Sequence, residues 1–168
     1  MIDAKLLLFM ILRFFGGLKL NDFDDRLILQ KRIYLLQFFG FPLDYRYNWY
    51  VRGPYCPQLT EEAYQASGCF SEIQEQVKGF ELTAESKEII GKYKLFEAEF
   101  DKQPLPLMLE LAASIHYLIH IGFLPGNKDA KNIAESLRQR RKIFIDDQFL
   151  AAWNALNKFG LIDNKMTS

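Results

Sequence analysis

One stretch of the chain, residues 29–59, most constrains what the whole can fold into. Its first part has apolar residues three or four positions apart, the spacing that lines one face of an α-helix. Gly40 is expected to end this helix because glycine readily adopts the left-handed conformation of a helix end, and Pro42 prevents continuation. An aromatic run and a glycine–proline corner follow at once. The stretch therefore predicts a helix, a strand-like segment and a rigid turn in direct succession.

The aromatic run covers residues 45–51 and is typical of a half-buried strand. The corner after it joins the unrestricted φ of Gly53 to the fixed φ of Pro54 and so holds Tyr55 in place. Cationic and aromatic side chains alternate here, as they do at interfaces with proteins and with nucleic acids. The simpler alternative is an edge strand whose outer face is only solvated. We expect a partner-binding surface made of Arg46, Asn48, Tyr50, Arg52, Gly53, Pro54 and Tyr55.

Two motifs in this stretch can be written LQK-x-(I/L)-Y-L and GPY-x-P-x-L. Their matching positions are Leu29, Gln30, Lys31, Ile33 and Tyr34, then Gly53, Pro54, Tyr55, Pro57 and Leu59, and the aromatic run between the two motifs adds Tyr50. They resemble the Panacea (SocA-like) antitoxin domain and the related YwgA-like proteins of bacteria and archaea, which usually have serine at the position of Cys56. Residues 109–118 and 142–162 are similar to YwgA-like C-terminal regions. The resemblance implies a non-enzymatic protein that occludes or sequesters a toxin, or another protein of a defence or stress module.

Length and composition indicate one compact domain with a packed core. The chain has 168 residues, of which 49% are hydrophobic and 15% aromatic, and a subdivision is conceivable near residues 101–106. The net charge is zero, but it is uneven: +3 over residues 1–60, −6 over 61–110 and +3 over 111–168. A neutral chain has no overall attraction for nucleic acid, although either end has enough cations for a basic face.

No segment predicts a membrane span or a bound cofactor. The apolar run at residues 6–12 is much shorter than the roughly 20 residues of a span, and it lacks a signal-peptide cleavage site. Cys56 and Cys69 are too few for a structural zinc site and are expected to be reduced thiols. We expect a cytoplasmic protein with no cofactor and no membrane partner.

The remaining residues predict a mainly α fold of about seven helices with a short β element. Further helices are expected over residues 2–15, 57–66, 83–100, 107–121, 128–137 and 148–159. Residues 73–82, with Gly79 near a turn, are interpreted as a short β-hairpin. A helix, a turn, a second helix and a hairpin follow one another in a winged helix, although any small α+β domain could give that order.

Two sets of residues are candidates for chemistry. His116 and His120 lie four positions apart on one expected helix, a spacing that can bring two imidazoles to a metal. No third ligand is identifiable, so packing histidines are the favoured interpretation. Cys56 in the corner could be a nucleophile, but no base lies near it in the sequence. We expect no catalytic residue and no metal site.

A basic run follows the helix expected at residues 128–137: Arg138, Arg140, Arg141 and Lys142. These cations could contact phosphates, although cations also favour the negative end of a helix, and a solvated helix end is the simpler interpretation. Two hypotheses of function follow. The first is a module that recognises a protein partner through the corner, and the second is a winged-helix DNA-binding subunit of a nucleic-acid-processing or defence complex. Salt-dependent DNA binding would separate them.

Overall fold

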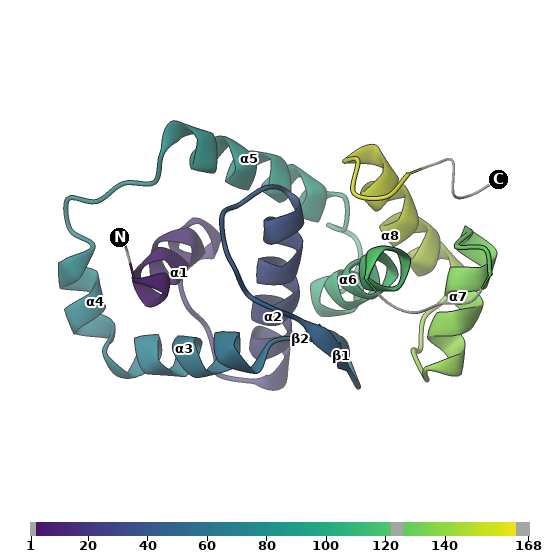
Figure 1. Cartoon of the computed structure of the whole chain (residues 1–168), viewed down its shortest axis with the longest axis horizontal. Coiled ribbons are helices and arrows are strands. Elements are labelled where there is room, and N and C mark those ends of the chain that lie inside the picture. Colours follow the sequence, from purple (N-terminus) through teal and green to yellow (C-terminus); the bar gives the residue numbers. More distant parts are fainter. Residues whose placement is uncertain (1–2, 122–125, 164–168) are drawn as a thin grey trace. The chain divides into compact units, whose positions relative to one another are not determined.

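The computed structural model of the chain describes residues 3–121 and 126–163 (Figure 1). In this part of the chain there are eight α-helices, one 3-10 turn and one two-stranded antiparallel sheet, so the expected mainly α fold with a short β element is confirmed. The elements are α1 Ala4–Leu12, η1 Arg13–Phe15, α2 Phe23–Phe38, β1 Asn48–Tyr50, β2 Gly53–Tyr55, α3 Pro57–Gly68, α4 Phe70–Gln76, α5 Ala84–Ala98, α6 Leu105–His120, α7 Ala130–Gln139 and α8 Asp146–Lys158.

The contacts within the chain divide it into two compact units. The first consists of Met1–Arg46 and Cys56–Tyr93, and the second of Tyr47–Tyr55 and Lys94–Ser168. The second boundary thus falls inside α5, ahead of residues 101–106, where the sequence suggests a subdivision. The hairpin belongs to the second unit, whereas the helices on either side of it in the sequence, α2 and α3, belong to the first.

The core of the first unit is built around α1, which packs against α3 and α4. Residues 8–12 are all buried, as expected for a helix that is apolar on nearly every face. One cluster of its core consists of Phe9, Met10, Ala66, Ile73 and Val77. Burial of these side chains removes apolar surface from water, which is the main force that holds such helices together.

A buried glutamine of α2 joins the two sequence motifs inside the first unit. The Gln30 side chain accepts a hydrogen bond from the backbone N–H of Cys56 at 2.9 Å and donates one to its carbonyl oxygen at 2.9 Å. It also donates to the Thr60 hydroxyl at 2.8 Å. The amide therefore satisfies both backbone groups of one residue, as a neighbouring strand would, and fixes the start of α3.

The β-hairpin lies at residues 48–55. Asn48 pairs with Tyr55, and Tyr50 pairs with Gly53 across a two-residue turn at residues 51–52. Gly53 has a φ of 87°, which a residue with a side chain rarely adopts and which matches its place directly after the turn. The strand expected over residues 45–51 is therefore reduced to residues 48–50, because its partner β2 ends at Tyr55, opposite Asn48.

The hairpin expected at residues 73–82 is wrong. Residues 70–76 form α4, followed by a turn, and Ile73 and Val77 both face the core cluster of the first unit. Their spacing of four is the helical repeat and not the alternation of a strand. The helix–turn–helix–hairpin order on which the winged-helix interpretation rests is consequently absent from these residues.

Helices α2 and α8 end in the same hydrogen-bonded turn, a Schellman motif. Gly40 has a φ of 98°, and the next residue, Phe41, donates its N–H to the carbonyl of Leu36 at 3.1 Å. Gly160 has a φ of 74°, and Leu161 donates to Leu156 at 2.9 Å. In both motifs a glycine takes the left-handed position, and the apolar residue after it is buried.

The second unit is organised around α6, whose residues 108–119 are all buried. This helix packs against β2, α7 and α8. Despite its apolar character, neither it nor any other helix in the described part of the chain has the length and hydrophobicity needed to cross a bilayer.

Candidate functional site

The structure brings part of the predicted partner-binding residues and part of the predicted nucleic-acid-binding residues together at one surface pocket of the second unit. Its volume is about 720 Å3, within the range of ligand and peptide sites. It is lined by residues 49–52 at the tip of the hairpin, residues 139–143 at the end of α7, and Leu107 and Glu110 of α6. The aromatic run and the basic run, about 90 positions apart in the sequence, therefore form one surface, which we call the hairpin pocket.

A buried ion pair holds the two sides of the hairpin pocket together. The Lys142 ammonium lies 3.1 Å from a carboxylate oxygen of Glu110 and donates a hydrogen bond to the Val51 carbonyl at 2.8 Å. Both charged side chains are buried. Burial lowers the pKa of Lys142, the Glu110 carboxylate opposes this by raising it, and the Arg52 guanidinium lowers it again. Lys142 thus ties the turn of the hairpin to α6.

The end of α7 explains why a lysine in a basic run points inward. Arg141 donates its N–H to the carbonyl of Arg138 at 3.0 Å, and Lys142 donates to Leu137 at 3.0 Å. This is the turn that ends α2 and α8, with Arg141 at the position of the glycine and Lys142 at that of the buried apolar residue. Arg141 has a φ of 62°, a conformation that costs an L-residue on the order of 1 kcal/mol.

Trp49 forms a half-buried wall of the hairpin pocket and is already in contact with cations. The Arg140 guanidinium and the Lys142 ammonium lie 5.8 and 5.5 Å from the centre of its ring, within reach of a cation–π interaction. The Tyr117 ring of α6 lies 5.7 Å away, centre to centre. Trp49 therefore anchors the hairpin to the second unit.

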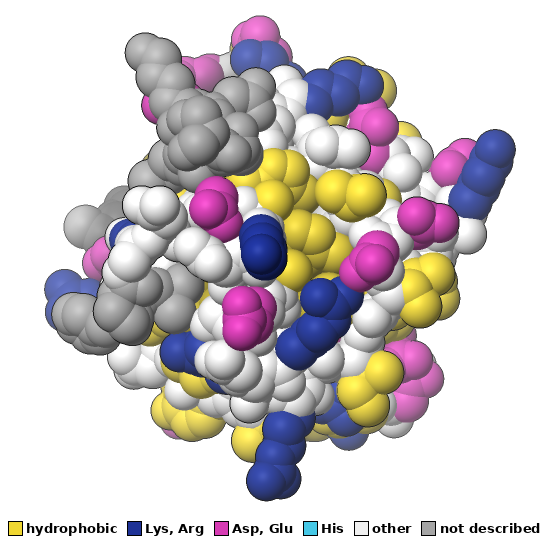
Figure 2. All heavy atoms as spheres, turned by 90° about the vertical axis from the view of Figure 1, so that its right-hand side faces the viewer, with side chains coloured by type: hydrophobic (Ala, Val, Ile, Leu, Met, Phe, Trp, Pro, Cys, Tyr) yellow, Lys and Arg dark blue, Asp and Glu magenta, His cyan; other side chains and the backbone are white. Residues whose placement is uncertain are grey.

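The outer part of the hairpin pocket combines exposed apolar and cationic side chains. Val51 is 87% exposed and Ile143 is 89% exposed, which is uncommon for aliphatic residues. Arg52, Arg140 and Arg141 are exposed as well. Figure 2, which shows the side of the molecule that carries α7 and α8, has hydrophobic side chains gathered between cationic and anionic ones. Such a mixture is typical of a surface that binds another macromolecule.

The predicted partner-binding residues divide into exposed and supporting groups. Asn48, Tyr50 and Arg52 are exposed, Tyr50 to 45%. Tyr55 is half-buried, and its ring packs edge-on against Tyr50 at 5.1 Å. Gly53 and Pro54 were expected to belong to the partner-binding surface, but both are buried, so they can shape this surface and cannot touch a partner. Arg46 is exposed but belongs to the first unit.

The predicted nucleic-acid residues divide in a similar way. Arg140 and Arg141 line the hairpin pocket, whereas Lys142 is buried in its ion pair and cannot reach a phosphate. Arg138 does not line the pocket. It pairs with Asp146 at 2.6 Å, and its guanidinium lies over the Phe144 ring at 4.7 Å.

Sequence reasoning missed the two exposed aliphatic residues and the ion pair. One signal was available for the ion pair, because Glu110 is the only Asp, Glu, Lys or Arg in the apolar segment 105–119 and a charge within a buried helix needs a partner. Val51 and Ile143 carried no signal, since an isolated aliphatic residue next to a turn looks the same whether it is buried or exposed.

The histidines pack against each other, as expected from the sequence. The His116 and His120 rings lie 4.5 Å apart, centre to centre, and the His120 ring is hydrogen-bonded to the Leu161 carbonyl at 2.8 Å. His116 is 2% exposed, and burial together with the charge of His120 lowers its pKa to about 3. Within residues 3–121 and 126–163, no three metal-ligating side chains of the His, Cys, Asp and Glu types form a group.

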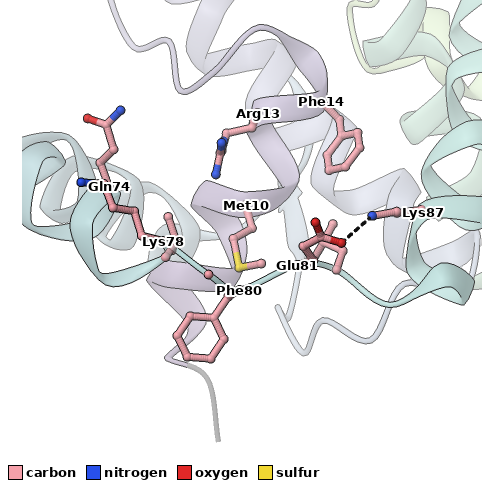
Figure 3. A pocket seen from close by; sticks show the side chains of 11 residues that line it. Met10, Arg13, Phe14, Gln74, Lys78, Phe80, Glu81 and Lys87 are labelled. Atoms are coloured by element: carbon pink, nitrogen blue, oxygen red, sulfur yellow. Dashed lines mark hydrogen bonds and ion pairs between the residues drawn. The ribbon is translucent and has the colours of Figure 1, made fainter.

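The first unit has a pocket of its own, of about 770 Å3, at the end of α1 (Figure 3). Met10 and Val77 of the core cluster contribute to its lining, together with residues 78–82. In Figure 3, Glu81 and Lys87 face each other, with nitrogen and oxygen 3.3 Å apart, and Arg13 extends from the same side of the helix as Met10. This pocket contains none of the residues that the sequence predicts to bind a partner, whereas the hairpin pocket contains several, so we regard the hairpin pocket as the functional candidate.

The comparisons with known proteins leave the resemblance to antitoxin domains as a prediction. No protein-family model, curated protein or solved structure matches the chain.

Proposed function

We propose that the protein is a non-enzymatic recognition module that binds a protein partner through the hairpin pocket. By the resemblance of its motifs to Panacea-type antitoxins, the partner is a toxin or another protein of a defence system, held by occlusion of its surface. The observation that carries the proposal is the convergence of the hairpin tip and the basic end of α7 on one pocket.

The composition of this surface supports a protein partner. Tryptophan, tyrosine and arginine are the residues that contribute most to binding at protein interfaces, and all three types line the hairpin pocket. The buried ion pair and the hairpin turn hold these residues before a partner arrives. A surface ordered in advance loses less conformational entropy on binding and therefore binds more tightly.

Binding of nucleic acid is the second candidate, and the observation in its favour is the set of exposed arginines. If it were correct, binding to duplex DNA would weaken steeply with salt, because each phosphate contact releases a counterion. A protein interface with an apolar centre would depend much less on salt.

The proposal can be tested by capture of partners from an extract of the source cells. The bait would be the wild-type chain, the variant V51D/I143D and the control L95D, because Leu95 is also an exposed aliphatic residue of the second unit, at 63%. We expect one protein to be retained by wild type and L95D and lost from V51D/I143D. Identical proteins on all three baits, or DNA alone on the wild type, would overturn the proposal.

A further inference from the structure

The charges that line the hairpin pocket do not cancel. Its cations are Arg52, Arg140, Arg141 and Lys142, and its acid is Glu110. Because Lys142 and Glu110 neutralise each other in the buried pair, Arg140 and Arg141 leave the outer part of the pocket with a net positive charge. The complementary ligand is therefore an anion.

One of these cations occupies a strained backbone position. Arg141 has the left-handed conformation that Gly160 has at the end of α8 in the same unit. A glycine would relieve the strain but would remove a guanidinium from the pocket. Strained residues of this kind gather at functional sites, where the side chain is needed in that position.

Aliphatic side chains border the same pocket. Val51 and Ile143 are almost fully exposed, one on the hairpin turn and one just after the end of α7. Burial of such surface against an apolar group of a partner favours the complex. A phosphate backbone offers no such group, whereas a protein segment does.

The aromatic rings of the pocket are poorly placed to stack on nucleic-acid bases. Trp49 is already flanked by Arg140, Lys142 and Tyr117. Tyr50 packs against Tyr55 and is less than half exposed. Proteins that bind single strands need open ring faces in addition to cations. An oligonucleotide would therefore be held mainly by arginine–phosphate contacts.

We propose that the hairpin pocket binds an acidic segment of a partner protein in which an aliphatic residue lies next to one or more carboxylates. This inference rests on the proposed function and names the chemistry that it recognises. Arg140 and Arg141 receive the carboxylates, since the planar guanidinium bonds a carboxylate through two parallel hydrogen bonds. The aliphatic residue is buried between Val51 and Ile143.

The first experiment selects ligands from random sequences, so the partner need not be identified beforehand. A library of random 12-residue peptides displayed on phage is selected on the immobilised wild-type chain and counter-selected on R140Q/R141Q. We expect the enriched peptides to carry Asp or Glu beside Leu, Ile or Val. Enrichment of basic or uncharged peptides, or no enrichment over the variant, would overturn the inference. Because both side chains are exposed, we expect R140Q/R141Q to fold, and circular dichroism checks this.

The second experiment measures the affinity of one selected peptide by fluorescence anisotropy. We expect the Kd to rise about tenfold or more for R140Q and for R141Q, the loss expected when a charge-assisted hydrogen bond is removed. The matched control is R13Q, an exposed arginine of the pocket in the first unit, which should leave the Kd unchanged. Equal binding of the peptide with glutamine in place of its acids would overturn the inference.

A labelled 12-nucleotide oligothymidylate separates the two classes of anion. We expect it to bind more weakly than the selected peptide at the same salt concentration. Tighter binding that is lost in R140Q/R141Q would assign the pocket to nucleic acid instead. If the extract yields a partner that depends on Val51 and Ile143 but not on the arginines, this inference fails while the proposed function stands. If no partner depends on the aliphatic residues, the proposed function fails.

Discussion

Helices α7 and α8 end in the same turn, but the residues that fill it differ in kind. At the end of α8, Gly160 takes the left-handed position and Leu161 is buried; at the end of α7, Arg141 and Lys142 occupy the equivalent positions. The α8 turn follows the usual preferences and serves stability. The α7 turn departs from them twice, with a strained arginine and a buried ammonium, and it is the one that lines the hairpin pocket. The departures from local preference in the second unit therefore coincide with the surface that we propose to be functional.

The largest effect is expected from breaking the ion pair at the α7 end. Lys142→Met leaves the Glu110 carboxylate buried without a counter-ion, which should lower the free energy of unfolding by about 3 to 5 kcal/mol. Urea denaturation measures this loss. The control is Lys158→Met, at an exposed pair with Glu99, which should cost less than about 1 kcal/mol.

The double variant K142M/E110L shows whether the lost stability arises from the unpaired charge. It should recover most of the stability, because an apolar pair of similar volume replaces a buried ion pair at little or no cost. A double variant no more stable than K142M would show that the hydrogen bond to Val51, and not the charge of Glu110, holds the turn.

Acidification is expected to lower stability through the histidine pair near the end of α8. There the His120 ring bonds the Leu161 carbonyl, and the His116 ring lies beside that of His120. The pKa of His116 falls from 6.5 to about 3 on folding, so below pH 6.5 the unfolded chain binds more protons than the folded one. Stability should therefore fall with acidification, and this histidine should contribute a loss of about 2 to 3 kcal/mol between about pH 7 and pH 4.5. Urea titrations at several pH values would show the slope, and His116→Gln should flatten it. An unchanged slope in that variant would assign the acid sensitivity to other groups.

Exchanging the residue at the left-handed position tests the two turns directly. Gly160→Arg places a side chain at a φ of 74° and should lower stability by about 1 to 2 kcal/mol. Thermal unfolding followed by circular dichroism measures the change. A neutral result would show that the α8 turn tolerates a side chain, and Arg141 could then no longer be interpreted as strained by comparison with it.

The smallest expected effect has the opposite sign. Arg141→Gly should raise stability by about 0.5 to 1 kcal/mol, because glycine adopts a φ of 62° without strain. The same variant should lose affinity for the selected acidic peptide. A gain in stability together with full affinity would show that the strained Arg141 is not needed to bind the peptide.

The sequence predicted the helices well, because their apolar stripes and glycine ends are local signals. It predicted a hairpin where α4 lies, since Ile73 and Val77 fit a weak strand pattern as well as a helical one, and only packing against α1 decides between them. It identified the aromatic run and the basic run as candidates for binding. It did not show that they form one pocket, which depends on contacts between residues that are distant in the chain. From the sequence, Lys142 was also expected to be a surface cation, because no glycine indicates the turn that places its side chain in the interior.

The two hydrogen bonds between Gln30 and the backbone of Cys56 have a consequence for residue 56. Gln30 bonds the peptide backbone at that position and not the thiol, so these two hydrogen bonds do not depend on which side chain residue 56 carries. A serine or an alanine could replace the cysteine without the loss of either bond. The sulfur is buried and takes no part in the two bonds, so the motif does not require a thiol at this position.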